Sequence, residues 1–169
     1  MVKEFIKYAL MFVILVVAQV VVFNHLCLFN VAIPLVFIYF IVKLPTNLGT
    51  NWTIALSFLL GFTVDVFSNS PGMNALACTV CGAVRMPVLR LYYPREEDMS
   101  APEPSPRTLG PAPFMKYAAT LTALYCLLFF FIEAFAFYNW GLMLARAAAS
   151  ALLTFIIIMA IESVTAVRR

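Results

Sequence analysis

The chain has 169 residues, of which 64% are hydrophobic and only 11% are charged, against roughly 25% charged residues in soluble domains. This composition excludes an ordinary water-soluble fold, and the length leaves room for a single transmembrane domain over residues 1–169. The formal net charge of +3 does not indicate nucleic-acid binding, since the basic residues flank hydrophobic segments and form no patch of their own.

Apolar segments long enough to suggest membrane spans follow one another closely. In chain order they cover residues 5–24, 29–44, 52–67, 73–92, 114–138 and 141–164. The first is too long for a signal peptide and lacks an A-x-A cleavage site, so we expect a retained helix. The second and third are short, and a partly re-entrant path is the alternative for either. We therefore predict an all-α membrane protein, a compact bundle of about six transmembrane helices.

The one long connection in this scheme, residues 93–113, contains six prolines and many charged or hydroxyl side chains. Such a composition predicts a flexible cytoplasmic loop, with docking of a partner as an alternative role.

Basic residues predict the orientation of the chain, because lysine and arginine collect on the cytoplasmic side of membrane proteins. If the N-terminus is cytoplasmic, an even number of spans places the following residues at cytoplasmic ends or loops: Lys3, Lys7, Lys43, Arg90, Arg95, Arg107, Lys116, Arg168 and Arg169. Both termini are therefore expected in the cytoplasm.

Ionisable side chains within spans are costly and usually face the bundle interior. Glu133 and Arg146 lie equally far from the turn between the last two spans, so we expect them to pair, with a ligand-binding role as the alternative. Arg146, Ser150 and Thr154 share a helix face that we expect to meet a polar face of the fifth span. The other ionisable residues are Asp65 in the third span and Arg85 and Glu162, a second candidate pair.

Catalytic chemistry finds no support in the residue pattern. The sole histidine, His25, falls in the first outer loop, and Cys78 and Cys81 form a C-x-x-C without a second pair or a neighbouring histidine. We therefore predict no enzyme activity, no catalytic residue, no cofactor and no metal site.

The most specific stretch runs from residue 61 to residue 76, across the end of the third span and the start of the fourth. Gly61, Asp65 and Ser68 are spaced to share one helix face, and Gly72 follows Pro71 at a break in the chain. Asn74 and Leu76 then open the fourth span, which brings the motif to the outer end of two adjacent helices.

This motif of Gly61, Asp65, Ser68, Gly72 and Leu76, with Asn74 beside it, resembles the MreD family of bacterial rod-shape-determining proteins. The resemblance implies a non-enzymatic scaffold in the bacterial inner membrane, part of the elongasome that makes lateral-wall peptidoglycan and regulates cell shape. It implies binding to MreC and, through MreC, association with MreB, RodA and a penicillin-binding transpeptidase. It also implies a fold like the substrate-binding component of energy-coupling-factor transporters.

The alternative function is the substrate-binding subunit of a vitamin-type transporter. In that case the polar faces around Asp65, Asn74, Glu133 and Arg146 would line a ligand cavity. Against it, the first span shows no ridge of alanines at every fourth residue, which such subunits present to their energising partner.

Overall fold

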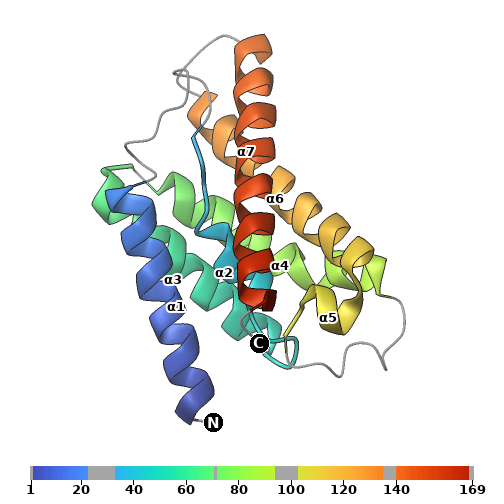
Figure 1. The fold of residues 1–169 in the computed structure, drawn as a ribbon. Coiled ribbons are helices and arrows are strands. Elements are labelled where there is room, and N and C mark those ends of the chain that lie inside the picture. The colour runs from blue at the N-terminus through green and yellow to red at the C-terminus, as the bar shows by residue number, and fades with distance from the viewer. Residues whose placement is uncertain (1, 23–32, 71, 94–102, 135–139, 168–169) are drawn as a thin grey trace.

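The computed structural model describes residues 2–22, 33–70, 72–93, 103–134 and 140–167, and every regular element in these ranges is an α-helix (Figure 1). The helices are α1 (Val2–Val21), α2 (Ile38–Lys43), α3 (Thr50–Ser68), α4 (Met73–Tyr92), α5 (Pro106–Leu109), α6 (Pro111–Ala134) and α7 (Trp140–Val167). Four of them, α3, α4, α6 and α7, are long and apolar enough to cross a membrane. The chain is therefore a membrane protein.

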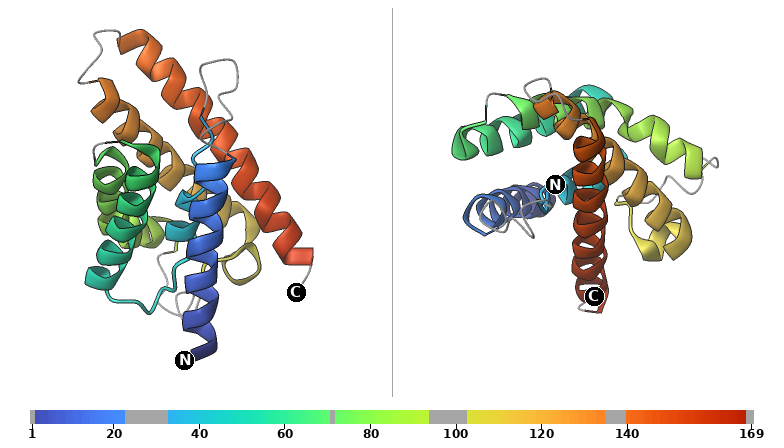
Figure 2. Two further views of the ribbon diagram at one scale, coloured as in Figure 1. Left: turned by 90° about the vertical axis from the view of Figure 1, so that its left-hand side faces the viewer. Right: turned by 90° about the horizontal axis from the view of Figure 1, so that it is seen from above.

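The long helices form two antiparallel pairs around a short central one. Helix α4 contacts both α3 and α6, and α6 contacts α7, while α2 lies in the middle against α4 and α6. Helix α1 stands at the side of the bundle and touches α3 and α2 (Figure 2). In Figure 1 and in the left view of Figure 2, the start of α1 and the end of α7 lie at the same end of the molecule.

The second predicted span does not form a spanning helix in its described part. Residues 33–35 are non-helical, and α2 has only 6 residues. Pro34 explains the late start, because proline has no N–H to donate and disfavours helical conformation in the residue before it. All residues of α2 are buried, so this apolar segment forms the centre of the bundle. The first span, 5–24, corresponds to α1, whose apolar part Ile6–Val21 is shorter than a typical span.

The second half of the predicted loop, residues 93–113, contains α5 and the start of α6. Ser105 begins α5 with a capping box, in which its side chain accepts from the backbone N–H of Thr108 and Thr108 accepts in return. Pro106 and Pro111 then occupy the first positions of α5 and α6, where a helix does not need the missing N–H. Residues 94–102 lie outside the described part of the chain.

Candidate functional site

Asp65, the acidic residue of the motif, holds the start of the next helix. Its Oδ1 accepts hydrogen bonds from the backbone N–H (3.1 Å) and side-chain amide (2.9 Å) of Asn74 and from the hydroxyl of Ser70, and its Oδ2 accepts from the backbone N–H of Ala75 (2.7 Å). Helix α4 begins after Gly72, which has no side chain to cap it. Asp65 therefore caps α4 from the neighbouring helix, where a carboxylate also interacts favourably with the helix dipole.

The turn between α3 and α4 uses residues that tolerate a left-handed backbone. Asn69 has φ 53° and Gly72 has φ 77°, a region that costs other residue types free energy. The backbone N–H groups of Asn69 and Ser70 both bond to the carbonyl of Asp65, which closes the end of α3.

Gly61 lets α3 and α4 approach each other closely. A Cβ atom at this position would overlap the carbonyl of Asn74 and come within 2.7 Å of the Cα of Ala75, so any side chain would push the helices apart. Asn74 in turn accepts a hydrogen bond from the hydroxyl of the buried Tyr125 on α6. The corner formed by α3 and α4 is thereby tied to a third helix.

The structure brings Gly61, Asp65, Gly72 and Asn74 together, but it places Leu76 on the exposed face of α4 and Ser68 half-buried on α3. Asp65 is only 4% exposed, so its carboxylate is not presented on the surface as a contact for another protein. Ser70 and Tyr125 also belong to the cluster. Tyr125 could not be predicted from the sequence, because nothing in its local pattern relates it to residue 74.

A surface cavity of about 320 Å³ adjoins this corner. Its lining combines Asp65 and the turn residues Asn69 and Ser70 with two exposed apolar side chains, Phe62 and Val66. The cavity thus has an apolar wall and a polar floor that the Asp65 hydrogen bonds hold in place.

Glu133 and Arg146 lie at the opposite hairpin, between α6 and α7, where Nη1 of Arg146 is 4.0 Å from Oε1 of Glu133. Both side chains are about 30% exposed, at 28% and 30%, and the guanidinium also lies 6.0 Å from the centre of the Phe130 ring. Oε2 of Glu133 and Nε of Arg146 have no hydrogen-bond partner. This is a long, partly exposed ion pair.

The predicted meeting of polar faces on the fifth and sixth spans is wrong, because Ser150 and Thr154 face a different element. Their hydroxyl oxygens accept the backbone N–H groups of Ile33 and Leu35, each at 3.0 Å. Gln19 of α1 completes the set: its side chain accepts from the N–H of Val36 and donates to the carbonyl of Pro34, again at 3.0 Å. Non-helical backbone inside a membrane needs such partners, because no water reaches it.

Side chains of α4 and α6 hydrogen-bond to the backbone carbonyls at the end of α2. Arg85, fully buried on α4, donates to the carbonyls of Leu44 and Pro45, and the hydroxyl of Tyr117 donates to the carbonyl of Val42 at 3.4 Å. Arg85 therefore does not pair with Glu162, contrary to the expectation from the sequence.

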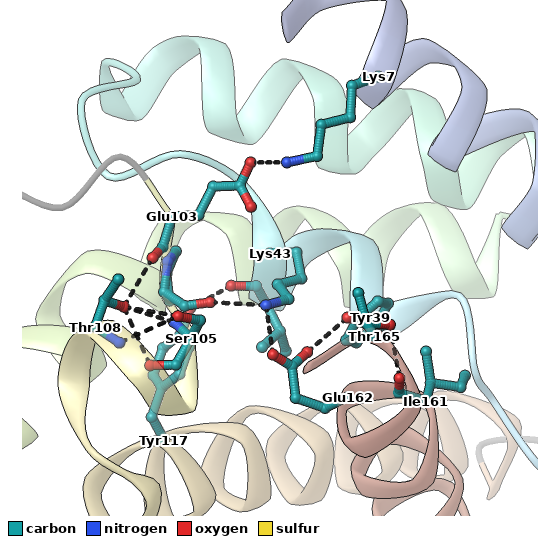
Figure 3. Close-up of polar contacts among 12 residues, drawn as sticks. Lys7, Tyr39, Lys43, Glu103, Ser105, Thr108, Tyr117, Ile161, Glu162 and Thr165 are labelled. Atoms are coloured by element: carbon teal, nitrogen blue, oxygen red, sulfur yellow. Dashed lines mark hydrogen bonds and ion pairs between the residues drawn. The ribbon is translucent and has the colours of Figure 1, made fainter. Parts of the chain in front are cut away.

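Glu162 is instead bound by residues of α2 (Figure 3). Its Oε1 accepts from Nζ of Lys43 at 2.8 Å and its Oε2 from the hydroxyl of Tyr39 at 2.7 Å. The same Lys43 donates to the carbonyl of Pro104 at 3.1 Å. A buried charge is stable only when it is paired and fully hydrogen-bonded, and this cluster meets that condition for Glu162.

The described part of the proline-rich segment also contacts α1. Glu103 forms an ion pair with Lys7 (Figure 3), and it accepts a hydrogen bond from the hydroxyl of Tyr8 at 2.8 Å. Together with Pro104, this residue ties the segment to both α1 and α2.

Among the described residues, the polar side chains inside the bundle mainly hold backbone and neighbouring helices. No group of three or more His, Cys, Asp or Glu residues in the described ranges is arranged to hold a metal ion, and Cys78, Cys81 and Cys126 are buried free thiols. The arrangement is therefore suited to fixing a shape.

Comparison of the chain with protein-family models, with curated protein sequences and with solved structures finds no match. The geometry of the corner between α3 and α4, together with the sequence motif that builds it, is therefore the basis on which a function is proposed.

Proposed function

We propose that this chain is a non-enzymatic scaffold of the MreD type in the bacterial inner membrane, with both termini in the cytoplasm. It binds MreC and thereby takes part in the elongasome, which determines rod shape and makes lateral-wall peptidoglycan. Contacts with MreB, RodA and a penicillin-binding transpeptidase are made through MreC.

The observation that supports this proposal is that the motif residues fold into one unit beside a surface cavity. Gly61 brings the helices together, Asp65 caps α4, and Asn74 links the corner to α6. A docking site needs rigid support behind the residues that make the contact. Asp65 thus acts by positioning the corner, and the exposed Phe62 and Val66 make the contact.

The chemistry of the cavity fits insertion of a partner's apolar or aromatic side chain. Phe62 and Val66 provide an apolar wall, and buried anchors of this kind dominate the energetics of protein interfaces. The polar atoms of the turn border the same space and offer acceptors at its edge.

The test fills this cavity without disturbing the Asp65 hydrogen bonds. Val66→Trp places a large side chain at the cavity wall, and Val164→Trp on α7 is a matched control, since the two valines are 61% and 60% exposed. We expect Val66→Trp to weaken the binding of MreC by about tenfold, or about 1.4 kcal/mol, and so to reduce the amount of MreC that co-purifies from bacterial membranes. The Val164→Trp variant should retain MreC and restore rod shape in cells lacking their own MreD.

Equal recovery of MreC with both variants, at equal membrane levels, would contradict the proposed contact. The transporter alternative has weaker support, because Asp65 and Asn74 are hydrogen-bonded within the corner while Glu133 and Arg146 lie in another hairpin. These four residues do not converge on one cavity lined by the described residues.

A further inference from the structure

A second, larger cavity of about 590 Å³ lies between α1 and α3, away from the corner. Phe40 and Leu44 form its buried floor, at 2% and 1% exposure, and Val13 of α1 and Leu59 of α3 form an exposed rim. Its size is within the range of about 300–1,000 Å³ that is typical of small-molecule sites. We call this cavity the α1–α3 groove.

The lining of the α1–α3 groove is apolar along its length. The residues that carry this property are Phe12, Phe40, Leu44, Leu48, Leu56 and Leu59. The rim lies on helices that carry many exposed apolar side chains, such as Leu10 and Val17 on α1. The groove therefore opens toward the hydrocarbon of the bilayer and selects an apolar occupant.

Helices α1 and α3 contact each other, and the groove beside them has a volume of about 590 Å³. A thin, flexible hydrocarbon chain matches a space of this size with an apolar lining.

One end of the groove carries a pair of opposite charges. Tyr8 lines the groove and donates to Glu103, which is also paired with Lys7. This pair lies at the beginning of the apolar stretch Ile6–Val21, which is the depth at which lipid headgroups meet the hydrocarbon. A zwitterionic headgroup matches it, with a phosphate for the ammonium of Lys7 and an ammonium for the carboxylate of Glu103.

We propose that the α1–α3 groove binds one zwitterionic phospholipid of the bilayer, with an acyl chain between α1 and α3 and its headgroup at Lys7 and Glu103. This site is separate from the corner between α3 and α4, so it does not depend on the proposed binding of MreC. The lipid fills the space beside α1 and links this helix to the bundle.

The test is native mass spectrometry of the full chain in mild detergent with added palmitoyl-oleoyl phosphatidylethanolamine. Ala9→Trp obstructs the groove, and Ala55→Trp is the control, because both alanines are exposed on apolar helices but only Ala9 lines the groove. We expect wild type and Ala55→Trp to bind one lipid with similar affinity and Ala9→Trp to bind about tenfold more weakly.

Palmitoyl-oleoyl glycerol, which has the same two acyl chains but no phosphoethanolamine group, tests the headgroup contact. Weaker binding of this diacylglycerol supports the proposal, whereas equal affinity for the two probes overturns the assignment of the headgroup to Lys7 and Glu103. Equal lipid binding by Ala9→Trp and Ala55→Trp overturns the site itself.

A crosslinking measurement on the wild-type chain tests the site even if Ala9→Trp does not fold. A phosphatidylethanolamine with a photoreactive group near the end of one acyl chain is crosslinked in vesicles, and the modified peptides are identified. Preferential labelling of residues 8–13 and 56–59 supports the proposal. Labelling spread evenly over all exposed apolar faces, as annular lipid alone would give, overturns it.

Discussion

At the scale of single residues, Asp65 shows how a carboxylate within an apolar chain is used. Both of its oxygens accept hydrogen bonds, two of them from backbone N–H groups at the start of α4. Those N–H groups would otherwise be buried without partners, because Gly72 cannot cap the helix. The charge is thus compensated locally, and the residue fixes the corner.

Asp65→Asn is expected to destabilise the fold even though the side chain keeps its size. The asparagine amide group replaces one acceptor oxygen, so a donor of Asn74, Ala75 or Ser70 loses its partner. Leaving a buried donor unsatisfied costs about 1–3 kcal/mol, and thermal unfolding in detergent should show the loss.

Thr63→Val on the same helix is the control for Asp65→Asn. The Thr63 hydroxyl donates to the carbonyl of Leu59 within α3, and such a change should alter stability by less than about 0.5 kcal/mol. If the two variants unfold at the same temperature, the capping role of Asp65 is refuted.

At the scale of elements, the segment from Ile33 to Pro45 explains several of the buried polar residues. Its backbone is held by Gln19 from α1, by Ser150 and Thr154 from α7, and by Arg85 and Tyr117 from α4 and α6. A short helix with non-helical flanks is possible at this depth only because surrounding helices supply these partners.

Thr154→Val and Thr122→Val form a matched pair that tests this explanation. Both threonines are fully buried, but Thr154 accepts the N–H of Leu35 while the Thr122 hydroxyl has no hydrogen-bond partner. Thr154→Val should lower the free energy of unfolding by about 1–3 kcal/mol, whereas Thr122→Val should be neutral or stabilising.

Unfolding with increasing denaturing detergent measures both changes on one scale. Equal losses for the two variants would mean that the threonine methyl and shape matter more than the hydrogen bond to residue 35. A larger loss for Thr122→Val would contradict the assignment directly.

At the scale of the whole molecule, the helices alternate in direction between two ends. The start of α3 lies at the same end as the start of α1, and the start of α7 lies at the opposite end (Figures 1 and 2). Combined with the positive-inside rule, this arrangement predicts that the end with both termini faces the cytoplasm.

Thiol labelling of single-cysteine variants checks this orientation. In a background with the four native cysteines replaced by serine, Trp140→Cys at the start of α7 should react with a membrane-impermeant reagent in intact spheroplasts. Asn51→Cys at the start of α3 should react only in inverted vesicles. Labelling of both positions from one side would contradict the helix arrangement, and the reverse pattern would contradict the orientation.

Where a long apolar run is bounded by turn residues, the position of the helix could be predicted from the sequence alone. The prediction for residues 73–92 coincides with α4, and 52–67 differs from α3 by only a few terminal residues, because long apolar runs bounded by turn residues have few alternative structures. The all-helical membrane character followed for the same reason. The predicted count of about six spans was not confirmed, since only four of the described helices are long and apolar enough to cross a membrane.

The partners of the polar residues were decided by the tertiary structure. Spacing placed Ser150 and Thr154 on one face of a helix, but it did not reveal that this face meets the backbone of residues 33–35. Likewise Glu162 pairs with Lys43, 119 residues away, and Arg85 caps the end of α2. The composition and periodicity of a segment depend only on its own residues, and they determine whether that segment forms a helix. Burial makes each unpaired polar group costly, so the partners depend on which segments the folded chain brings together.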